Sequence, residues 1–306
     1  MKRTWNRREF LQTTGSGISA ALALAAGGGP LLAAGEPTAE LSTPSAAKLG
    51  WKVSIATYTF RSVSFYEALE KTAALGVRHV EPAFFLKLDS KRPELQTSEN
   101  LSAALRKEMR QRMEDHGIHM SSYYANVTDD ADASKRVFEF AKEMGAGTIV
   151  AEPPATAFDM VEDLCKEYQL NLAVHNHPKR PTSHYWHPDN VLAVCKGRSK
   201  RIGACCDTGH WIRSKLHVVP SLKKLEGRIV SMHLKDVAEW GKPEARDVPL
   251  GQGLANYQQA LQELRRQNFQ GVTAIEYEHQ SEQLMEDLTA CLNFVEKTAR
   301  EMLDRG

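Results

Sequence analysis

The sequence predicts an α/β fold, a (β/α)₈ TIM barrel that occupies residues 51–306. Short apolar runs alternate with amphipathic helical stretches along this region, and such alternation is typical of a parallel sheet with right-handed crossovers. Eight strand–helix units in about 250 residues fit a closed barrel. The rival, an open doubly wound sheet, often has a glycine-rich phosphate turn after its first strand, but residues 56–61 contain no such turn.

The predicted elements follow one another regularly, and a glycine often ends a helix just before the next strand. The predicted strands cover 53–58, 76–81, 117–122, 147–152, 171–175, 201–207, 229–233 and 271–276. The predicted helices cover 65–75, 99–116, 133–144, 158–168, 188–196, a less regular stretch that ends near 225, 257–267 and 283–303. The run at 201–207 suits a strand buried on both faces, and it stops at a carboxylate, Asp207.

The N-terminal segment is predicted to lie outside the barrel. Adjacent Arg7 and Arg8 stand before Phe10 and a weakly apolar, Ala/Gly-rich stretch, a pattern that resembles a twin-arginine export signal. We therefore expect a signal peptide at 1–34, a linker at 35–50, and a periplasmic or other extracytoplasmic location reached by the twin-arginine route. Glycines and a proline would interrupt a spanning helix here, so no stable membrane anchor is expected. The alternative is a disordered basic leader.

Charge and cysteine content limit the classes of function. The chain has 306 residues, 25% of them charged, and a net charge of +1, which gives no reason to expect a nucleic-acid partner. Its five cysteines are odd in number and show no CxxC spacing. A disulfide framework is therefore not expected, even in an exported protein.

Metal-competent side chains stand at the ends of the last five predicted strands. They are Glu152, His175 with His177, Asp207 with His210, His233 with Lys235 and Asp236, and Glu276 with Glu278. Strand ends meet at one face of a barrel, and carboxylates gathered there would repel one another unless a cation neutralised them. The sequence therefore predicts a metal site on one half of the ring, with hydroxyls and aromatics on the other. Taken singly, each residue has a plain alternative as a surface carboxylate or a satisfied core histidine.

Four motifs carry a family resemblance. They are Asp-Thr-Gly-His at 207–210, Met-His-Leu-Lys-Asp at 232–236, Val-Pro-Leu-Gly-Gln-Gly at 248–253 and Ala-Ile-Glu at 274–276. They resemble the xylose isomerase-like barrel superfamily, which includes sugar isomerases, ketose 3-epimerases, inosose dehydratases and endonuclease IV. The resemblance implies a single Mn²⁺- or Mg²⁺-like ion, with Asp207, His233 and Glu276 at ligand positions. The endonuclease branch is set aside, because the near-neutral chain lacks several histidines of a multi-zinc centre.

A departure from the family pattern leaves the fourth ligand open. The family usually has a Glu-Asn-His motif on the fifth strand, where this chain has His175, Asn176 and His177. Either His175 binds the ion, or Glu152 reaches across from the fourth strand; we favour Glu152, because three carboxylates and one histidine suit a hard ion. Mn²⁺ is then the expected cofactor, with Mg²⁺, Co²⁺ and Zn²⁺ as alternatives. Glu152 could instead be an N-terminal charge for the following helix.

The resemblance implies an isomerase or epimerase that removes a proton beside a carbonyl and hydroxyl pair held by the ion. His175 and His177 are the candidate bases, since imidazole exchanges protons near neutral pH. Lys235 is a candidate partner of a developing oxyanion, and its alternative is a solvated lysine.

The candidate substrate contacts are aromatic or polar side chains on the same face. They are Tyr58, Trp186, His210 and Glu278. Trp186 lies in an aromatic and basic loop at 178–187 that fits a carbohydrate pocket but could also merely cap the barrel. His210 could instead orient Asp207.

Two other functions stay open at this point. The same proton abstraction permits elimination, so a metal-dependent lyase or dehydratase acting on an inosose or a 3-keto-glycoside is the first alternative. The second is a non-catalytic sugar-binding protein, which would have no need of carboxylates around an ion. The expected partner is a small carbohydrate, and a homo-oligomer is compatible with the sequence.

Overall fold

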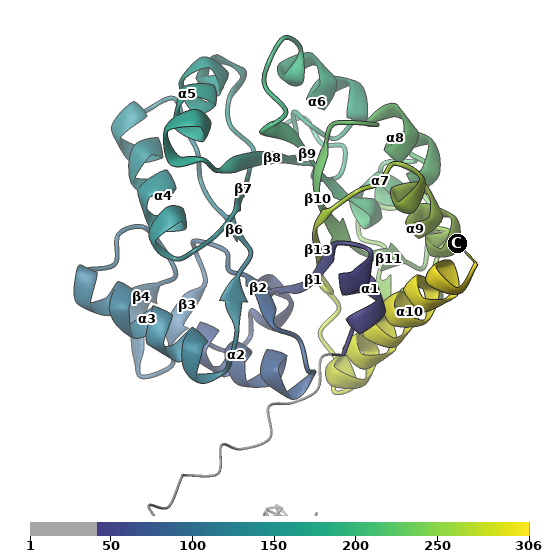
Figure 1. The fold of residues 1–306 in the computed structure, drawn as a ribbon, viewed down its shortest axis with the longest axis horizontal. Coiled ribbons are helices and arrows are strands. Elements are labelled where there is room, and N and C mark those ends of the chain that lie inside the picture. Colours follow the sequence, from purple (N-terminus) through teal and green to yellow (C-terminus); the bar gives the residue numbers. More distant parts are fainter. Residues whose placement is uncertain (1–41, 306) are drawn as a thin grey trace, which may run out of the picture. The chain divides into compact units, whose positions relative to one another are not determined.

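The computed structural model describes residues 42–305, and these residues form the predicted barrel (Figure 1). The predicted signal peptide at 1–34 lies outside the described residues, as does the predicted linker up to residue 41. Within that linker, Pro44–Lys48 forms a short helix, α1. Its first amides, those of Ser45 and Ala46, donate to the Glu296 carboxylate on the last helix, α10 (Leu284–Asp304). The packed fold therefore begins before residue 51.

The barrel consists of parallel strands that surround a common axis. They are β1 (Trp51–Ala56), β2 (His79–Glu81), β5 (His119–Met120), β6 (Ser122–Tyr124), β7 (Thr148–Ala151), β8 (Asn171–His175), β9 (Ile202–Asp207), β10 (Ile229–Leu234) and β13 (Gly271–Ile275). The sheet order is β5-β2-β1-β13-β10-β9-β8-β7-β6. Because β5 and β6 are two parts of one strand interrupted at Ser121, this order describes a ring of eight strands, as the sequence predicts.

The ring closes through Ser121. Its amide donates to Val80 on β2 at 3.1 Å, and its carbonyl accepts from Gly147, just before β7, at 3.2 Å. One residue thus bonds to both neighbouring strands. A bridge between Ala83 and Tyr124 extends the closure toward the end where the strands finish.

Helices cover the outside of the ring (Figure 1). They are α2 (Phe65–Ala74), α3 (Ala103–Asp115), α4 (Ala131–Glu143), α5 (Phe158–Tyr168), α6 (Pro188–Cys195), α7 (Thr208–Arg213), α8 (Val218–Lys224), α9 (Tyr257–Arg266) and α10. Helix α7 and two hairpins, β3 (Lys87–Asp89) with β4 (Arg92–Gln96) and β11 (Asp236–Val237) with β12 (Asp247–Val248), are additions to the predicted units. Both hairpins follow strands that carry site residues, β2 and β10.

Alternation along the strands decides which side chains enter the barrel. On β8, Leu172 and Val174 belong to the large core between sheet and helices. Ala173 instead packs in a separate small cluster with Val150 and Cys205 of the neighbouring strands. Because successive side chains of a strand point to opposite faces, the residue two places after Ala173, which is His175, also points inward. The interior above these small residues is left for polar side chains.

Two further properties concern the described part of the chain. All five cysteines lie there, buried and unpaired. Among residues 42–305, no helix combines the length and apolarity that crossing a bilayer requires.

Candidate metal centre and the cavity above it

The junction between β9 and α7 places one carboxylate at the centre of the site. Asp207 ends β9 and is the N-cap of α7, where its Oδ1 accepts from the His210 amide at 2.8 Å. Asn176 holds the Asp207 backbone on both sides, accepting from its amide at 2.9 Å and donating to its carbonyl at 3.0 Å. The second oxygen, Oδ2, is buried and has no hydrogen-bond partner. The cap therefore fixes the carboxylate and leaves Oδ2 to an ion pair with Lys235 Nζ, 3.1 Å away.

His175, at the end of β8, lies between two carboxylates. Its Nδ1 is 3.2 Å from Glu152 Oε1, and its Nε2 is 3.7 Å from Asp207 Oδ2 and has no hydrogen-bond partner. Burial lowers the pKa of this imidazole, but the Asp207 and Glu152 carboxylates outweigh burial and raise the pKa of His175 to about 10. Without a metal, His175 is therefore a cation at neutral pH.

His233, on β10, has the same arrangement with its nitrogens exchanged. Its Nε2 is 2.6 Å from Glu81 Oε1 at the end of β2. Its Nδ1 is 3.8 Å from Asp207 Oδ2 and 3.3 Å from Glu276 Oε2, and it makes no hydrogen bond. Ser122 donates to the other oxygen of Glu81 at 2.5 Å. Each imidazole thus has one nitrogen on an outer carboxylate and one facing Asp207.

Lys235 supplies the positive charge at the centre. Its Nζ is 3.1 Å from Asp207 Oδ2, 2.7 Å from Glu276 Oε2 and 3.1 Å from Glu278 Oε1, and its side chain is fully buried. Burial alone would lower the pKa of this ammonium, but the three carboxylates, Asp207 first, raise the pKa of Lys235 well above its usual value. The alternative of a solvated lysine is therefore excluded by its place in the barrel.

His210 and Arg213, one turn apart on α7, lie behind the Asp207 carboxylate: His210 faces Asp207, and Arg213 contacts His210. The Arg213 guanidinium can only donate, so the His210 Nδ1 that it contacts at 3.1 Å is an acceptor. The His210 proton then lies on Nε2, 3.5 Å from Asp207 Oδ2. Burial lowers the pKa of His210 well below its usual value, which keeps the ring neutral. Arg213 also binds Asp247 and Glu278, at 2.6 and 2.7 Å.

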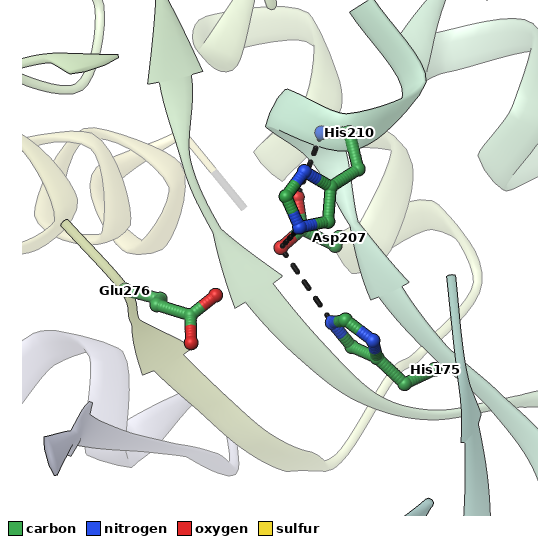
Figure 2. A group of neighbouring side chains, drawn as sticks. All are labelled: His175, Asp207, His210 and Glu276. Carbon is green, nitrogen blue, oxygen red and sulfur yellow. Dashed lines mark hydrogen bonds and ion pairs between the residues drawn. The ribbon is translucent and has the colours of Figure 1, made fainter. Parts of the chain in front are cut away.

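These residues fit a divalent ion. Figure 2 shows His175 and His210 on two sides of the Asp207 carboxylate, with Glu276 turned toward the same space; candidate ligand atoms of the four lie within 4.8 Å of one another. His210 itself has no free nitrogen for an ion, because Arg213 contacts its Nδ1 and its proton lies on Nε2. Separations of 3.3, 3.7 and 3.8 Å among ligand atoms of His175, Asp207, His233 and Glu276 are near the ~3.4 Å between ligands that lie about 2.1 Å from a tetrahedral ion. Buried polar atoms normally have partners, but here His175 Nε2 and His233 Nδ1 have no hydrogen-bond partner, and Asp207 Oδ2 has only its ion pair with Lys235.

Charge leads to the same conclusion. Four carboxylates, those of Asp207, Glu276, Glu278 and Asp247, contact only two permanent cations among the described residues, Lys235 and Arg213, which leaves two negative charges at the centre. A divalent cation would balance them, and without one they are balanced by protons taken up on the imidazoles.

Comparison with known proteins identifies the family. The model of the xylose isomerase-like TIM barrel family matches residues 69–294. The chain belongs to this family. A solved, uncharacterised protein from Parabacteroides distasonis is 32% identical, with a TM-score of 0.65 over 81% of this chain and 99% of the other. No match was found among curated proteins.

More distant solved structures show the same fold. A D-tagatose 3-epimerase-like protein shares 16% identity, with a TM-score of 0.62 over 83% of this chain and 98% of the other. A probable 3-DHS dehydratase from Bacillus anthracis shares 15% identity, with a TM-score of 0.58 over 80% and 98% of the two chains. The proteins that share this fold therefore include one named as epimerase-like and one named as a probable dehydratase.

The family resemblance placed Asp207, His233 and Glu276 at ligand positions, and the structure brings their side chains together beneath one cavity. Glu152, the favoured fourth ligand, forms a second potential metal group with His175 and His177. Burial raises its pKa, but hydrogen bonds from the two imidazoles outweigh burial and lower the pKa of Glu152 to about 2. The carboxylate is therefore ionised, on the far side of the His175 ring from Asp207. Which of the two residues binds the ion stays a prediction.

A cavity of about 1000 Å³ lies above this cluster. Seven of the predicted site residues line it: Tyr58, Glu152, His175, His177, His210, Glu276 and Glu278. Asp207, His233 and Lys235 are buried and are not among the lining residues. Trp186 does not line the cavity either; its ring packs under the Lys179 ammonium, 4.5 Å away, and against His187. The predicted contact of Trp186 with substrate therefore has no support in this geometry.

The opposite wall of the cavity is aromatic, as the sequence predicts for the other half of the ring. Phe85 is 40% exposed, and its ring lies 5.9 Å from Tyr58 and 6.4 Å from Tyr124 in edge-on contacts. The cavity therefore has a charged floor and a flat apolar side.

Sequence reasoning missed several residues of the site, among them Glu81 and Arg213. Glu81 is the last residue of the strand predicted at 76–81, and this position, equivalent to that of Glu152 or Asp207, was a signal that could have found it. Arg213 had no such signal, because its contact with His210 depends on helix α7, which starts directly at Asp207.

Proposed function

We propose that this chain is a divalent-metal-dependent isomerase or epimerase that moves a carbon-bound proton beside a sugar carbonyl. The observation that carries the proposal is the convergence of two buried imidazole nitrogens without hydrogen-bond partners, His175 Nε2 and His233 Nδ1, on the Asp207 carboxylate, whose Oδ2 has only an ion pair with Lys235, under a cavity of about 1000 Å³. The epimerase-like neighbour supports the choice of chemistry, while the sequence motifs supplied the expectation.

Asp207, His233 and Glu276, with His175 or Glu152, would hold the ion; Mn²⁺ is the first choice. When bound, such an ion supplies Lewis-acid polarisation of adjacent hydroxyl and carbonyl oxygens. Lys235 holds the carboxylates of Glu276 and Glu278 in place at 2.7 and 3.1 Å. Lys235 does not line the cavity, so its charge reaches a substrate oxygen through the carboxylates that it holds and not by direct contact.

His177 is the residue best placed to accept the proton. Its side chain is 46% exposed and lines the cavity, and its Nδ1 contacts Glu152 Oε1. An ionised carboxylate accepts only, so Nδ1 carries the ring proton and Nε2 is left as the basic nitrogen. The Glu152–His177 pair therefore works as a carboxylate-supported base.

The test is proton exchange in D₂O with Mn²⁺ and a panel of ketoses, inososes and 3-keto-glycosides, followed by NMR. We expect deuterium at one carbon of one substrate class. The change Asp207→Asn, which keeps the helix cap, should abolish exchange. His177→Gln should slow it about 10²-fold or more, and His79→Gln, a control at the other end of β2, should leave it unchanged. No exchange on any substrate by metal-loaded protein would refute the proposal.

The same incubations separate the alternatives. Release of a leaving group together with exchange would identify a lyase. Sugar binding that persists in Asp207→Asn protein after complete metal removal would identify a binding protein, because such a protein needs no ion.

We also propose export by the twin-arginine route, on the strength of the Arg7-Arg8 motif alone. Fractionation of cells expressing the full chain should find it outside the cytoplasm, and the change of both arginines to lysine should retain it inside. Equal distribution of the two forms would contradict the proposal.

A further inference from the structure

Two carboxylate–imidazole pairs stand on opposite sides of the centre. Glu152 Oε1 lies 3.2 Å from His175 Nδ1, and Glu81 Oε1 lies 2.6 Å from His233 Nε2. The remaining nitrogens, His175 Nε2 and His233 Nδ1, face the same Asp207 oxygen at 3.7 and 3.8 Å. The two rings use different nitrogens but have the same arrangement. In each, one nitrogen contacts an outer carboxylate and the other faces Asp207 Oδ2.

An ionised carboxylate accepts hydrogen bonds and cannot donate, so the nitrogen that it contacts carries the proton. The opposite nitrogen then has a free lone pair once the ring is neutral. A metal needs this form of histidine, and an outer carboxylate makes the ring a stronger ligand and fixes its orientation. The contacts of Glu152 and Glu81 thus leave His175 Nε2 and His233 Nδ1 available as metal ligands.

Glu81 has no oxygen to spare for an ion. Its Oε1 is engaged by His233, and its Oε2 accepts from Ser122 Oγ at 2.5 Å. The residue lines the cavity but is only 2% exposed, so its carboxylate is largely shielded from solvent. Glu81 is therefore a positioning residue, fixed from β6 and acting across the barrel on β10.

Glu152 also has its contacts on the outer side of a ring. Its Oε1 lies within reach of His175 Nδ1, His177 Nδ1 and the Tyr124 hydroxyl, which is 3.4 Å away. The two nitrogens of an imidazole point in opposite directions, so a carboxylate on Nδ1 cannot also contact an ion on Nε2 of the same ring. This geometry favours His175 over Glu152 as the fourth ligand.

We propose that Glu81 and Glu152 hold His233 and His175 as nitrogen ligands, and that the resulting set of two imidazoles and two carboxylates discriminates against Mg²⁺. Imidazole suits Co²⁺, Zn²⁺ and other transition metals, whereas Mg²⁺ requires oxygen ligands. This inference rests on the metal-dependent function proposed above, but it concerns ion binding alone and its test requires no turnover.

The test measures Kd for Mg²⁺, Mn²⁺, Co²⁺ and Zn²⁺ by competition with a fluorescent chelator, on the purified full chain. We expect one ion per chain and a Co²⁺ affinity at least 10³-fold above that for Mg²⁺. His175→Glu should narrow this ratio at least tenfold and should shift the visible absorption of bound Co²⁺, since a nitrogen ligand is replaced by oxygen. An unchanged ratio and spectrum would overturn the assignment of His175.

Glu81→Gln and Glu152→Gln should each weaken Co²⁺ binding 10- to 100-fold. Glu263→Gln is the matched control, because Glu263 is equally buried at 5% exposure but pairs with Arg266 and Gln267 away from the site. Ser122→Ala, which removes only a hydroxyl donor to Glu81, is the milder variant if Glu81→Gln does not fold; it should weaken Co²⁺ binding severalfold. Unchanged Co²⁺ affinity in folded Glu81→Gln or Ser122→Ala protein would refute the role of Glu81.

Two further outcomes are decisive. Binding of a second Co²⁺ that disappears in Glu152→Gln protein would make Glu152 a ligand and overturn its positioning role. Selective Co²⁺ binding without proton exchange on any sugar would leave this inference standing and refute only the proposed isomerase, so the two failures are distinguishable.

Discussion

Replacing Gly209 by alanine should displace the Lys235 side chain. Gly209 lies on the first turn of α7, and a Cβ there would be 2.6, 2.7 and 2.9 Å from Cγ, Cδ and Cβ of Lys235. Ordinary contacts between carbons begin near 3.5 Å, so the lysine stem would have to move by roughly 1 Å. Its Nζ cannot follow without lengthening contacts to Asp207, Glu276 and Glu278.

The magnitude follows from two opposing terms. Overpacking costs about 1–3 kcal/mol, and the upper end applies because the crowded stem is fully buried and anchored at its tip. Alanine in a helix recovers about 1 kcal/mol relative to glycine. The net loss of stability is therefore about 2 kcal/mol, which corresponds to a Tm lower by roughly 4–8 °C in a domain of this size.

Differential scanning calorimetry of apo protein is the assay. Gly147→Ala is the control, since the nearest atom to its added Cβ is a carbonyl oxygen 4.0 Å away, and its Tm should stay within about 2 °C of wild type. In a double-mutant cycle with Lys235→Ala, the cost of Gly209→Ala should largely vanish, because two of the three contacted atoms are gone. A wild-type Tm for Gly209→Ala, or a full cost in the Lys235→Ala background, would refute the reasoning.

Three other perturbations have expected results. Asp236→Ala should lower the free energy of unfolding in urea by about 3 kcal/mol or more, because its carboxylate accepts from the amides of residues 237, 251, 253 and 255; a loss below 1 kcal/mol would show that water replaces it. Burial, with help from His119 and Lys52, lowers the pKa of His79 from 6.5 to about 4, so its contribution to stability is present above pH 6.5 and is lost as pH falls toward 4. His79→Gln should reduce the slope of stability against pH in that window by at most about 1.4 kcal/mol per pH unit, and an identical slope would contradict the assignment. All five thiols are buried, so native protein should react with a thiol reagent only on the timescale of unfolding. Reaction of one or more thiols per chain before unfolding would show that a cysteine is accessible.

The repeating part of the fold could be predicted closely from the sequence. The predicted strand at 171–175 and helix at 158–168 have the bounds of β8 and α5. Glycines mark most of the boundaries, and several adopt positive φ there, as Gly76 and Gly117 do at 68° and 61°. The local sequence therefore suffices to predict the bounds of helices and strands whose ends are set by their own residues.

The sequence could predict that several residues of the candidate site lie at one end of the barrel, but not which of their atoms face one another. Strand periodicity predicts that Asp207, His233 and Glu276 share one end of the barrel, because each ends a strand. It does not say which nitrogen of His175 faces Asp207, since that depends on Glu152 one strand away. The pairing of Glu81 with His233 joins residues on opposite sides of the ring, and only closure of the barrel brings them together.

The additional elements depend on tertiary contacts in the same way. Helix α7 has only six residues, and a short helix has little stability of its own. Its cap at Asp207 and the contact of Gly209 with Lys235 hold it in place. Trp186 looked like a carbohydrate contact from its neighbours in sequence, but its ring packs on Lys179 within its own loop.

Ring closure has a consequence for how the chain can fold. The first and last strands pair directly, with Trp51 beside Gly271, so the seam between them cannot form until nearly the whole polypeptide has been synthesised. A nascent chain that lacks β13 has unpaired edges on both β1 and β10, and exposed edges invite association with other chains. Contacts so distant in sequence also make folding slow. We therefore expect C-terminal truncation before residue 271 to produce aggregates rather than a smaller stable domain.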